Sequence, residues 1–230
     1  MRRRTVKQAF IHSIPVMAGY LVLGTGFGIL LRNAGYGAGW AFAMSLLIYA
    51  GSLQYVGVSL IAGGASVVTA LLTSLMVNAR HLFYSISMIG KYKDAGRYKP
   101  YMIFALTDET YSILCGSDPE SVDVRLYRFL LSLFNHCYWI AGSVLGRLLG
   151  ALLPFSTAGI EFSMTALFIA SFTEQWRAGG NHLPALTGLL GSLLCLLMFG
   201  PERFLIPAML LITLVLTLLR SRLSAGEEET

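Results

Sequence analysis

The chain has 230 residues and a mass of 25.1 kDa, with 55% hydrophobic residues, only 13% charged residues and a mean hydropathy of +0.65. Soluble globular proteins carry about 25% charged residues, so this composition leaves too little charge to cover a water-facing surface. From Asn33 to Ala79 there is no Asp, Glu, Lys or Arg, a run long enough for two membrane crossings of about 20 residues each. We therefore expect an all-α, polytopic integral membrane protein.

The net charge of +5 does not indicate a nucleic-acid partner, because the basic residues gather at the chain ends and in one loop, as in membrane proteins. Cys115, Cys137 and Cys195 lie in apolar segments without a close pair, which argues against disulfides and a metal site. Three arginines at residues 2–4 are followed by an apolar stretch over residues 14–31, in the manner of a signal peptide. Because this stretch is long and more spans follow, we interpret it as a retained first helix.

Hydropathy predicts seven or eight transmembrane segments in one transmembrane domain that fills residues 1–230. The strong apolar segments are 12–31, 38–62, 66–90, 128–153, 183–199 and 203–219, and two weaker ones that contain acidic residues are 101–116 and 161–176. Residues 1–11 are expected to form a basic N-terminus and residues 220–230 a polar C-terminal tail. The remaining polar connections are too short to hold a soluble domain.

Basic residues give two answers about topology. The cluster at residues 2–7 places the N-terminus in the cytoplasm, but three full crossings would then place the basic loop 91–99 outside. A re-entrant second or third segment would return that loop to the cytoplasm. We expect a cytoplasmic N-terminus and keep both arrangements open.

Glycines recur every four residues on two of the expected helices. Gly142, Gly146 and Gly150 form one such series, and Gly24 and Gly28 form another. Small residues at this spacing allow two helices to approach closely in a membrane. The pattern predicts tight helix packing at both places.

The first concentration of polar residues is Gly51, Ser52 and Gln54, in the middle of segment 38–62. A helix interrupted at this point would expose backbone N–H and C=O groups to a polar ligand, as in many transporters. The alternative is an ordinary helix with a notch of small residues for packing.

The second concentration is Asn78, Arg80 and His81, deep in segment 66–90. An arginine inside a membrane needs an anion, which would be either the substrate or a structural ion pair, unless the side chain reaches the interface. His81 is either a proton carrier or a hydrogen-bonded core residue.

The third concentration is Thr107, Asp108 and Glu109 in segment 101–116. Adjacent helical residues point about 100° apart, so the two carboxylates do not easily share one partner. Their repulsion in an apolar setting favours proton uptake by one of them, which suits proton coupling. The alternative is that both are solvated near the membrane surface.

The second half offers weaker candidates in Asn135 and His136, which precede the glycine series. No nucleophile elbow, zinc-binding helix or phosphate-binding glycine loop is present, so no catalytic residue, metal site or cofactor is predicted. The chain is not expected to be an enzyme.

The three polar motifs resemble the AzlC-type family, the large subunit of two-component branched-chain amino acid exporters. The matching stretches are residues 50–54, 78–84 and 106–109, with weaker similarity at Trp139, Gly142, Gly146 and residues 161–168. The resemblance runs from about Phe10 to Leu219. Leu53 departs from it, since a small residue is expected there, and this change would alter pocket volume.

The resemblance implies export of leucine, isoleucine, valine and often methionine through a bacterial cytoplasmic membrane, together with a small hydrophobic AzlD-type partner subunit. A zwitterionic substrate needs an anion site and a cation site, and proton coupling is the expected energy source. A passive channel and a membrane scaffold subunit are the alternatives. The expected substrate-binding residues are Gly51, Ser52, Gln54, Asn78, Arg80 and Thr107, and the expected proton-coupling residues are Asp108, Glu109 and His81.

Overall fold

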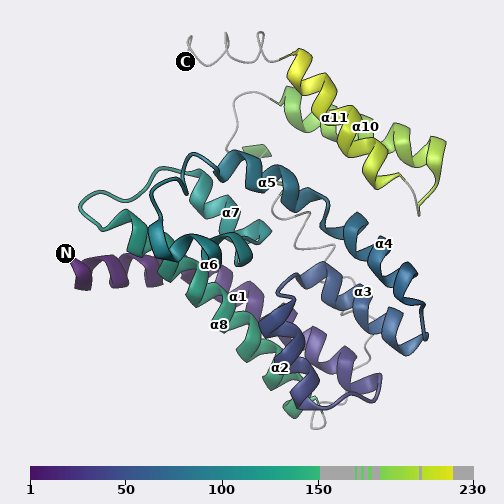
Figure 1. Ribbon diagram of the computed structural model, residues 1–230, viewed down its shortest axis with the longest axis horizontal. Helices are drawn as coiled ribbons and strands as arrows, with labels where there is room; N and C mark the ends of the chain where they lie inside the picture. The colour runs from purple at the N-terminus through teal and green to yellow at the C-terminus, as the bar shows by residue number, and fades with distance from the viewer. Residues whose placement is uncertain (151–168, 170–171, 174–175, 178–181, 202–203, 220–230) are drawn as a thin grey trace. The chain divides into compact units, whose positions relative to one another are not determined.

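The described part of the chain is helical, as Figure 1 shows for the computed structural model. The structure describes all residues except 151–168, 170–171, 174–175, 178–181, 202–203 and 220–230. The C-terminal tail, the match at residues 161–168 and most of segment 161–176 therefore lie outside the described residues. The count of seven or eight crossings stays a prediction. The described residues divide into two compact units, one of residues 1–74 with 81–150 and one of residues 75–80 with the described residues from 169 onward.

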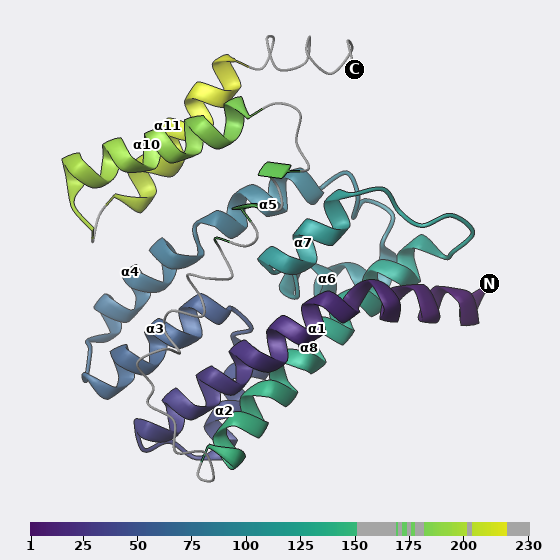
Figure 2. The same ribbon diagram turned by 180° about the vertical axis from the view of Figure 1, so that it is seen from behind.

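Two long helices, α1 (Arg2–Asn33) and α8 (Val124–Leu149), form the centre of the first unit. Among the described helices these two are long and apolar enough to cross a membrane. The basic N-terminus expected at residues 1–11 is continuous with α1. Figures 1 and 2 show the two helices side by side.

The helices α1 and α8 run parallel. At one end the backbone N–H of Asp123 donates to Thr5 Oγ1 at 3.1 Å, and at the other Arg32 Nη1 donates to the Gly150 carbonyl at 2.6 Å. If α1 and α8 both cross a membrane, the chain between them has to return to its starting side.

The glycine series explain how closely α1 and α8 approach. A Cβ atom added to Gly24 would lie 2.9 Å from Ser143 N, and one added to Gly142 would lie 2.7 Å from Tyr20 O. Both contacts are with backbone, which cannot swing aside. The packing predicted from the glycine spacing is confirmed.

The expected segment 38–62 is two helices, α2 (Ala38–Leu47) and α3 (Gly51–Ala62), joined by residues 48–50. They fold back on each other, because Gln54 bonds to Ser45 and a Cβ atom on Gly57 would lie 3.6 Å from Met44 Cε. The hairpin starts beside the C-terminal ends of α1 and α8, where Arg147 donates to the Tyr36 carbonyl.

The expected segment 101–116 is likewise two helices, α6 (Lys99–Phe104) after the 3-10 turn η1 (Gly96–Tyr98), and α7 (Asp108–Cys115). Residues 105–107 separate them. Met102 of α6 and Leu114 of α7 share a buried cluster with Tyr127 and Leu131, near the start of α8. This hairpin therefore lies at the end of α8 opposite to the start of α2.

Segment 66–90 is also divided, into α4 (Val67–Asn78) and α5 (Arg80–Met88), with Ala79 between them. Met88, at the end of α5, belongs to the buried cluster near the start of α8. In the second unit, α10 (Leu183–Phe199) and α11 (Leu205–Leu218) pack together, with Gly191 facing Ile212.

Candidate functional site

The break between α2 and α3 and the break between α6 and α7 meet at His136, near the middle of α8. His136 Nε2 lies 3.1 Å from the Ser45 carbonyl of α2, and Nδ1 lies 2.9 Å from the Tyr101 hydroxyl of α6. Because a carbonyl only accepts, a neutral ring carries its proton on Nε2, and Nδ1 accepts from Tyr101. One buried side chain thus contacts both broken segments.

The break between α2 and α3 is held by Tyr49 and Ala50. Tyr49 has a φ of 44°, unusual for a residue with a side chain, and its ring stacks on His136 with centroids 4.1 Å apart. Ala50 is extended and has no side-chain acceptor with which to cap α3. The first backbone bond of α3 runs from Gln54 N to Ala50 O at 2.8 Å, so the N–H groups of residues 51–53 precede the intrahelical bonds.

The interruption predicted near Gly51 is confirmed, although a tyrosine and not a glycine takes the positive φ. Gly51 has a different role, because a Cβ atom there would lie 3.1 Å from Trp139 Cη2. Its missing side chain lets the indole ring sit against the first turn of α3.

Gln54 joins three helices. Its side chain is fully buried, accepts from Trp139 Nε1 at 2.8 Å and donates to Ser45 Oγ at 3.2 Å. Because a buried amide costs free energy unless it is hydrogen-bonded, these contacts fix α2 and α3 against α8.

The break between α6 and α7, at residues 105–107, places a carboxylate next to a buried tyrosine. Thr107 caps α7 by accepting from Thr110 N, and its Oγ1 lies 2.7 Å from the Tyr20 hydroxyl. The same hydroxyl donates to Glu109 Oε2 at 2.7 Å. A short, charge-assisted hydrogen bond of this kind is among the stronger ones in proteins, so Tyr20 orients Glu109.

Asn135 adds an acceptor beside this break. It is fully buried, and its Nδ2 donates to Thr110 Oγ1 at 3.0 Å. Its Oδ1 is buried and has no hydrogen-bond partner among the described residues. An unmet buried acceptor costs about 1–3 kcal/mol, which a donor supplied by a ligand or a water molecule would recover.

Part of the predicted site lies in two hydrogen-bonded groups, which meet where the rings of Tyr20 and Trp139 pack with centroids 5.3 Å apart and together form the polar network. Gln54 belongs to the group that contains Trp139, and Thr107 and Glu109 belong to the group that contains Tyr20. Gly51 and Ser52 begin α3, and Asp108 begins α7. Asn78 and Arg80 belong to the second unit. His81 lies in the first unit, with its ring edge-on to Tyr84 at 5.9 Å.

Tyr20 and Trp139 were not predicted as site residues, and Asn135 and His136 were noted only as weaker candidates. A signal was present, because Asn135, Trp139, Gly142 and Gly146 follow the spacing of one helix face. Polar residues on the same face as a glycine series are expected to point toward the neighbouring helix.

A family model described as AzlC protein matches residues 15–153 of the chain. The chain is 44% identical over 222 residues to the branched-chain amino acid transport protein AzlC of Bacillus subtilis, covering 96% of this chain and 87% of the relative. It is 42% identical over 221 residues to an uncharacterized membrane protein of Helicobacter pylori, covering 96% and 97%. It is 23% identical over 196 residues to the inner membrane protein YgaZ of Escherichia coli, covering 82% and 80%. No solved structure matches the chain.

These relatives are membrane and transport proteins by name, and the long apolar helices of this chain agree with them. The chain is therefore a helical membrane protein. The weak similarity expected at residues 161–168 lies beyond the stretch that the family model matches.

Proposed function

The chain belongs to the AzlC family, and from that premise we propose that it is the large subunit of a two-component secondary transporter in a bacterial cytoplasmic membrane. Its proposed activity is export of leucine, isoleucine and valine, with methionine as a further substrate. The observation that carries this proposal is the meeting of two helix breaks at a buried polar network midway along α8. Transporters bind substrates near the bilayer midplane at interrupted helices of this kind.

The fold supports a cytoplasmic N-terminus. Lys91 donates to the carbonyls of Cys115 and Gly116, at 2.9 and 2.6 Å, and Tyr98 stacks on Phe129, so the basic loop lies near the start of α8. Because α1 and α8 are parallel, that loop and the N-terminal basic cluster share one end of the unit. The positive-inside rule then assigns both to the cytoplasm, with the second segment re-entrant.

In this arrangement the two hairpins enter the membrane from opposite sides. The α2–α3 hairpin enters from outside, the α6–α7 hairpin enters from the cytoplasm, and their breaks meet at the centre. Each hairpin separates the network from one aqueous side, which is the arrangement that alternating access requires.

The polar network supplies opposite partners for a zwitterion. The N-termini of α3 and α7 carry the positive ends of helix dipoles, which suit the substrate carboxylate. Glu109 and the unmet acceptor Asn135 Oδ1 suit the ammonium group. Tyr49 and Trp139 supply aromatic walls for the apolar side chain.

The proposed substrate-binding set keeps the residues expected from the sequence. The first unit contributes Gly51, Ser52, Gln54 and Thr107, and the sequence alone proposes Asn78 and Arg80, which belong to the second unit. Arg80 is a second candidate partner for the carboxylate, and the charge reversal Arg80→Glu is expected to abolish export. Unchanged export and affinity in that variant would remove Arg80 from the site.

Uphill export needs an energy source, and we assign it to the proton gradient through Glu109, Asp108 and His81. Collapsing the gradient with a protonophore is expected to abolish export against a leucine gradient while leaving downhill exchange. Persistence of uphill export would contradict proton coupling without contradicting transport itself.

The test is export from cells loaded with apolar dipeptides, in which leucine, valine, isoleucine and methionine are measured in the medium. The cells express this chain alone, this chain with a small AzlD-type partner, or that pair carrying Asp108→Asn or Asn135→Leu. Saturable efflux that requires the partner and is weakened by both variants supports the proposal.

The alternatives give different results in the same cells. A passive channel would release amino acids without saturation, and a scaffold subunit would tolerate alanine at Gln54, Arg80 and Asp108 together without losing its partner. Unchanged efflux of all four amino acids, with both subunits present in the membrane, would refute the proposed substrates.

A further inference from the structure

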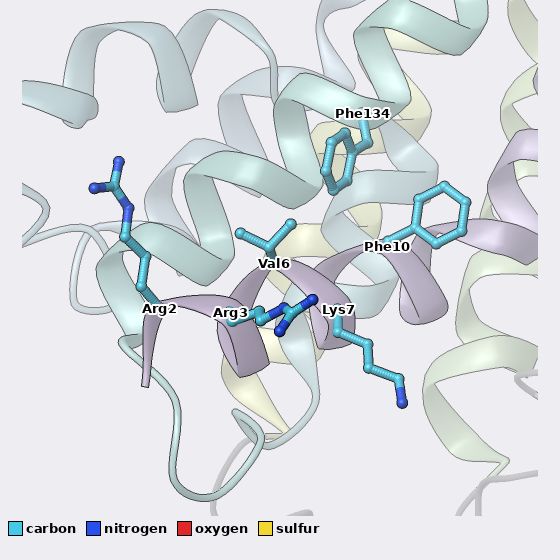
Figure 3. A pocket seen from close by; sticks show the side chains of 6 residues that line it. All are labelled: Arg2, Arg3, Val6, Lys7, Phe10 and Phe134. Atoms are coloured by element: carbon cyan, nitrogen blue, oxygen red, sulfur yellow. The ribbon is translucent and has the colours of Figure 1, made fainter.

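A hollow of about 650 Å³ at the start of α1 combines basic and apolar side chains. It is lined by Arg2, Arg3, Val6, Lys7 and Phe10 of α1 and by Phe134 of α8. Figure 3 shows Val6 between Arg3 and Phe134, with Arg2 and Lys7 extending to opposite sides. No acidic residue lines it, so its charge is positive throughout.

The hollow lies where α1 leaves the apolar part of a membrane. With 32 residues, α1 is about 48 Å long, whereas a hydrocarbon core is about 30 Å thick. The apolar run of α1 begins near residue 12, so the first turns of the helix extend to the level of lipid headgroups. The basic side chains are therefore placed at the depth of lipid phosphates.

The apolar wall of the hollow is partly exposed. Phe10 is 45% exposed and its ring packs edge-on against Phe134, with centroids 6.0 Å apart. Val6 is 40% exposed on the same wall. A ligand that fits carries an anionic group for the arginines and lysine and an apolar chain for these three side chains.

We infer that this hollow binds an anionic phospholipid, with the phosphate near Arg3, Arg2 and Lys7 as flanking cations, and an acyl chain along Phe10 and Phe134. Charge complementarity selects the occupant, because basic residues beside a membrane helix attract anionic headgroups. A zwitterionic lipid carries its own cation and gains less from three basic side chains. The hollow is separate from the polar network, so this binding does not depend on the proposed transport activity.

The test uses the full chain, purified and delipidated in detergent. Binding of a fluorescent short-chain phosphatidylglycerol is measured by anisotropy, with phosphatidylcholine and inorganic phosphate as comparison ligands. The triple variant Arg2→Gln, Arg3→Gln and Lys7→Gln removes the cations. A matched triple variant, Lys93→Gln, Arg97→Gln and Lys99→Gln, removes the same charge from the basic loop.

Saturable binding of phosphatidylglycerol, preferred over phosphatidylcholine, is expected. Each basic residue near an anionic surface raises the affinity by a factor of about five. The triple variant of the hollow is therefore expected to bind phosphatidylglycerol on the order of a hundredfold more weakly. The loop variant is expected to bind as the original chain does. Phe134→Ala is expected to weaken lipid binding, although it keeps every charge.

Three results would overturn the inference. Equal weakening in both triple variants would indicate attraction by overall charge, and equal affinity for inorganic phosphate would indicate an anion site without an acyl chain. Failure of phosphatidylglycerol to bind the original chain would refute a lipid site directly. The six substituted side chains are exposed, so both triple variants are expected to fold as the original chain does. Melting curves of the variants check this.

Discussion

The substitution Gly142→Ala tests whether the close approach of α1 and α8 holds the site together. Its new Cβ atom would lie 2.7 Å from the Tyr20 carbonyl oxygen and 3.1 Å from Leu21 Cα. Carbon and oxygen atoms in ordinary contact are about 3.3–3.6 Å apart, so the helices have to separate by roughly half an ångström or more. Both contacted atoms are backbone, and no rotation of a side chain relieves the clash.

Overpacking of this kind costs about 1–3 kcal/mol, and alanine regains up to about 1 kcal/mol through its better helix propensity. A net loss of about 1–2 kcal/mol corresponds to a melting temperature lower by about 2–8 °C for a chain of this length. Because the contacted carbonyl belongs to Tyr20, the 2.7 Å hydrogen bonds of its hydroxyl to Thr107 and Glu109 are expected to lengthen. Export is therefore expected to fall together with stability.

Gly19→Ala is the matched control, since a Cβ atom there has no described atom within 4 Å. This variant gains helix propensity without a steric clash. Its melting temperature is therefore expected to equal or exceed that of the original chain. Thermal unfolding in detergent, followed by tryptophan fluorescence, measures both variants. If Gly142→Ala is as stable as Gly19→Ala and exports normally, close glycine packing does not position the site.

Three further substitutions test other parts of the reasoning. Glu109→Gln keeps an acceptor for the Tyr20 hydroxyl but cannot carry a proton, so uphill leucine export is expected to be lost. The control Glu120→Gln, in an exposed loop, is expected to retain uphill export. Gln54→Leu leaves a buried indole N–H without its acceptor and is expected to cost about 1–3 kcal/mol in thermal unfolding; an unchanged melting curve would contradict the bridging role. In a chain whose native cysteines are replaced by serine, Ser66→Cys is expected to react with an impermeant maleimide in whole cells, and Asp94→Cys only after lysis. Labelling of both from the same side would contradict the opposite entry of the hairpins.

Local sequence features predicted the class of the protein and several of its details. The charge-free run from Asn33 to Ala79 indicates membrane helices, because charge is costly in hydrocarbon whatever the fold. The spacing of Gly24 and Gly28, and that of Gly142 and Gly146, predicts close helix contact, because helical periodicity places each series on one face of its own helix. The interruption near Gly51 was predicted for a similar local reason.

The tertiary structure decided how these pieces combine. Segment 101–116 reads as one apolar stretch, but Thr107, which caps α7, also forms a hydrogen bond with a tyrosine 87 positions earlier in the chain. That tyrosine also distinguishes Glu109 from its neighbour Asp108 by a direct hydrogen bond, although the two adjacent acids look alike in the sequence. Hydropathy does not contain such long-range contacts.

The relative direction of the helices also depends on tertiary contacts. Counting charges left two topologies open, because a half-crossing and a full crossing have similar composition. The parallel packing of α1 and α8, fixed by contacts at Thr5 and Arg32, requires an odd number of crossings between them if both span the membrane. The sequence alone determined that this chain is a membrane protein, and it offered an interrupted helix near Gly51 as one of two alternatives. Only the packing of residues distant along the chain decided where the interruptions meet, because relative helix direction depends on those contacts and not on local periodicity.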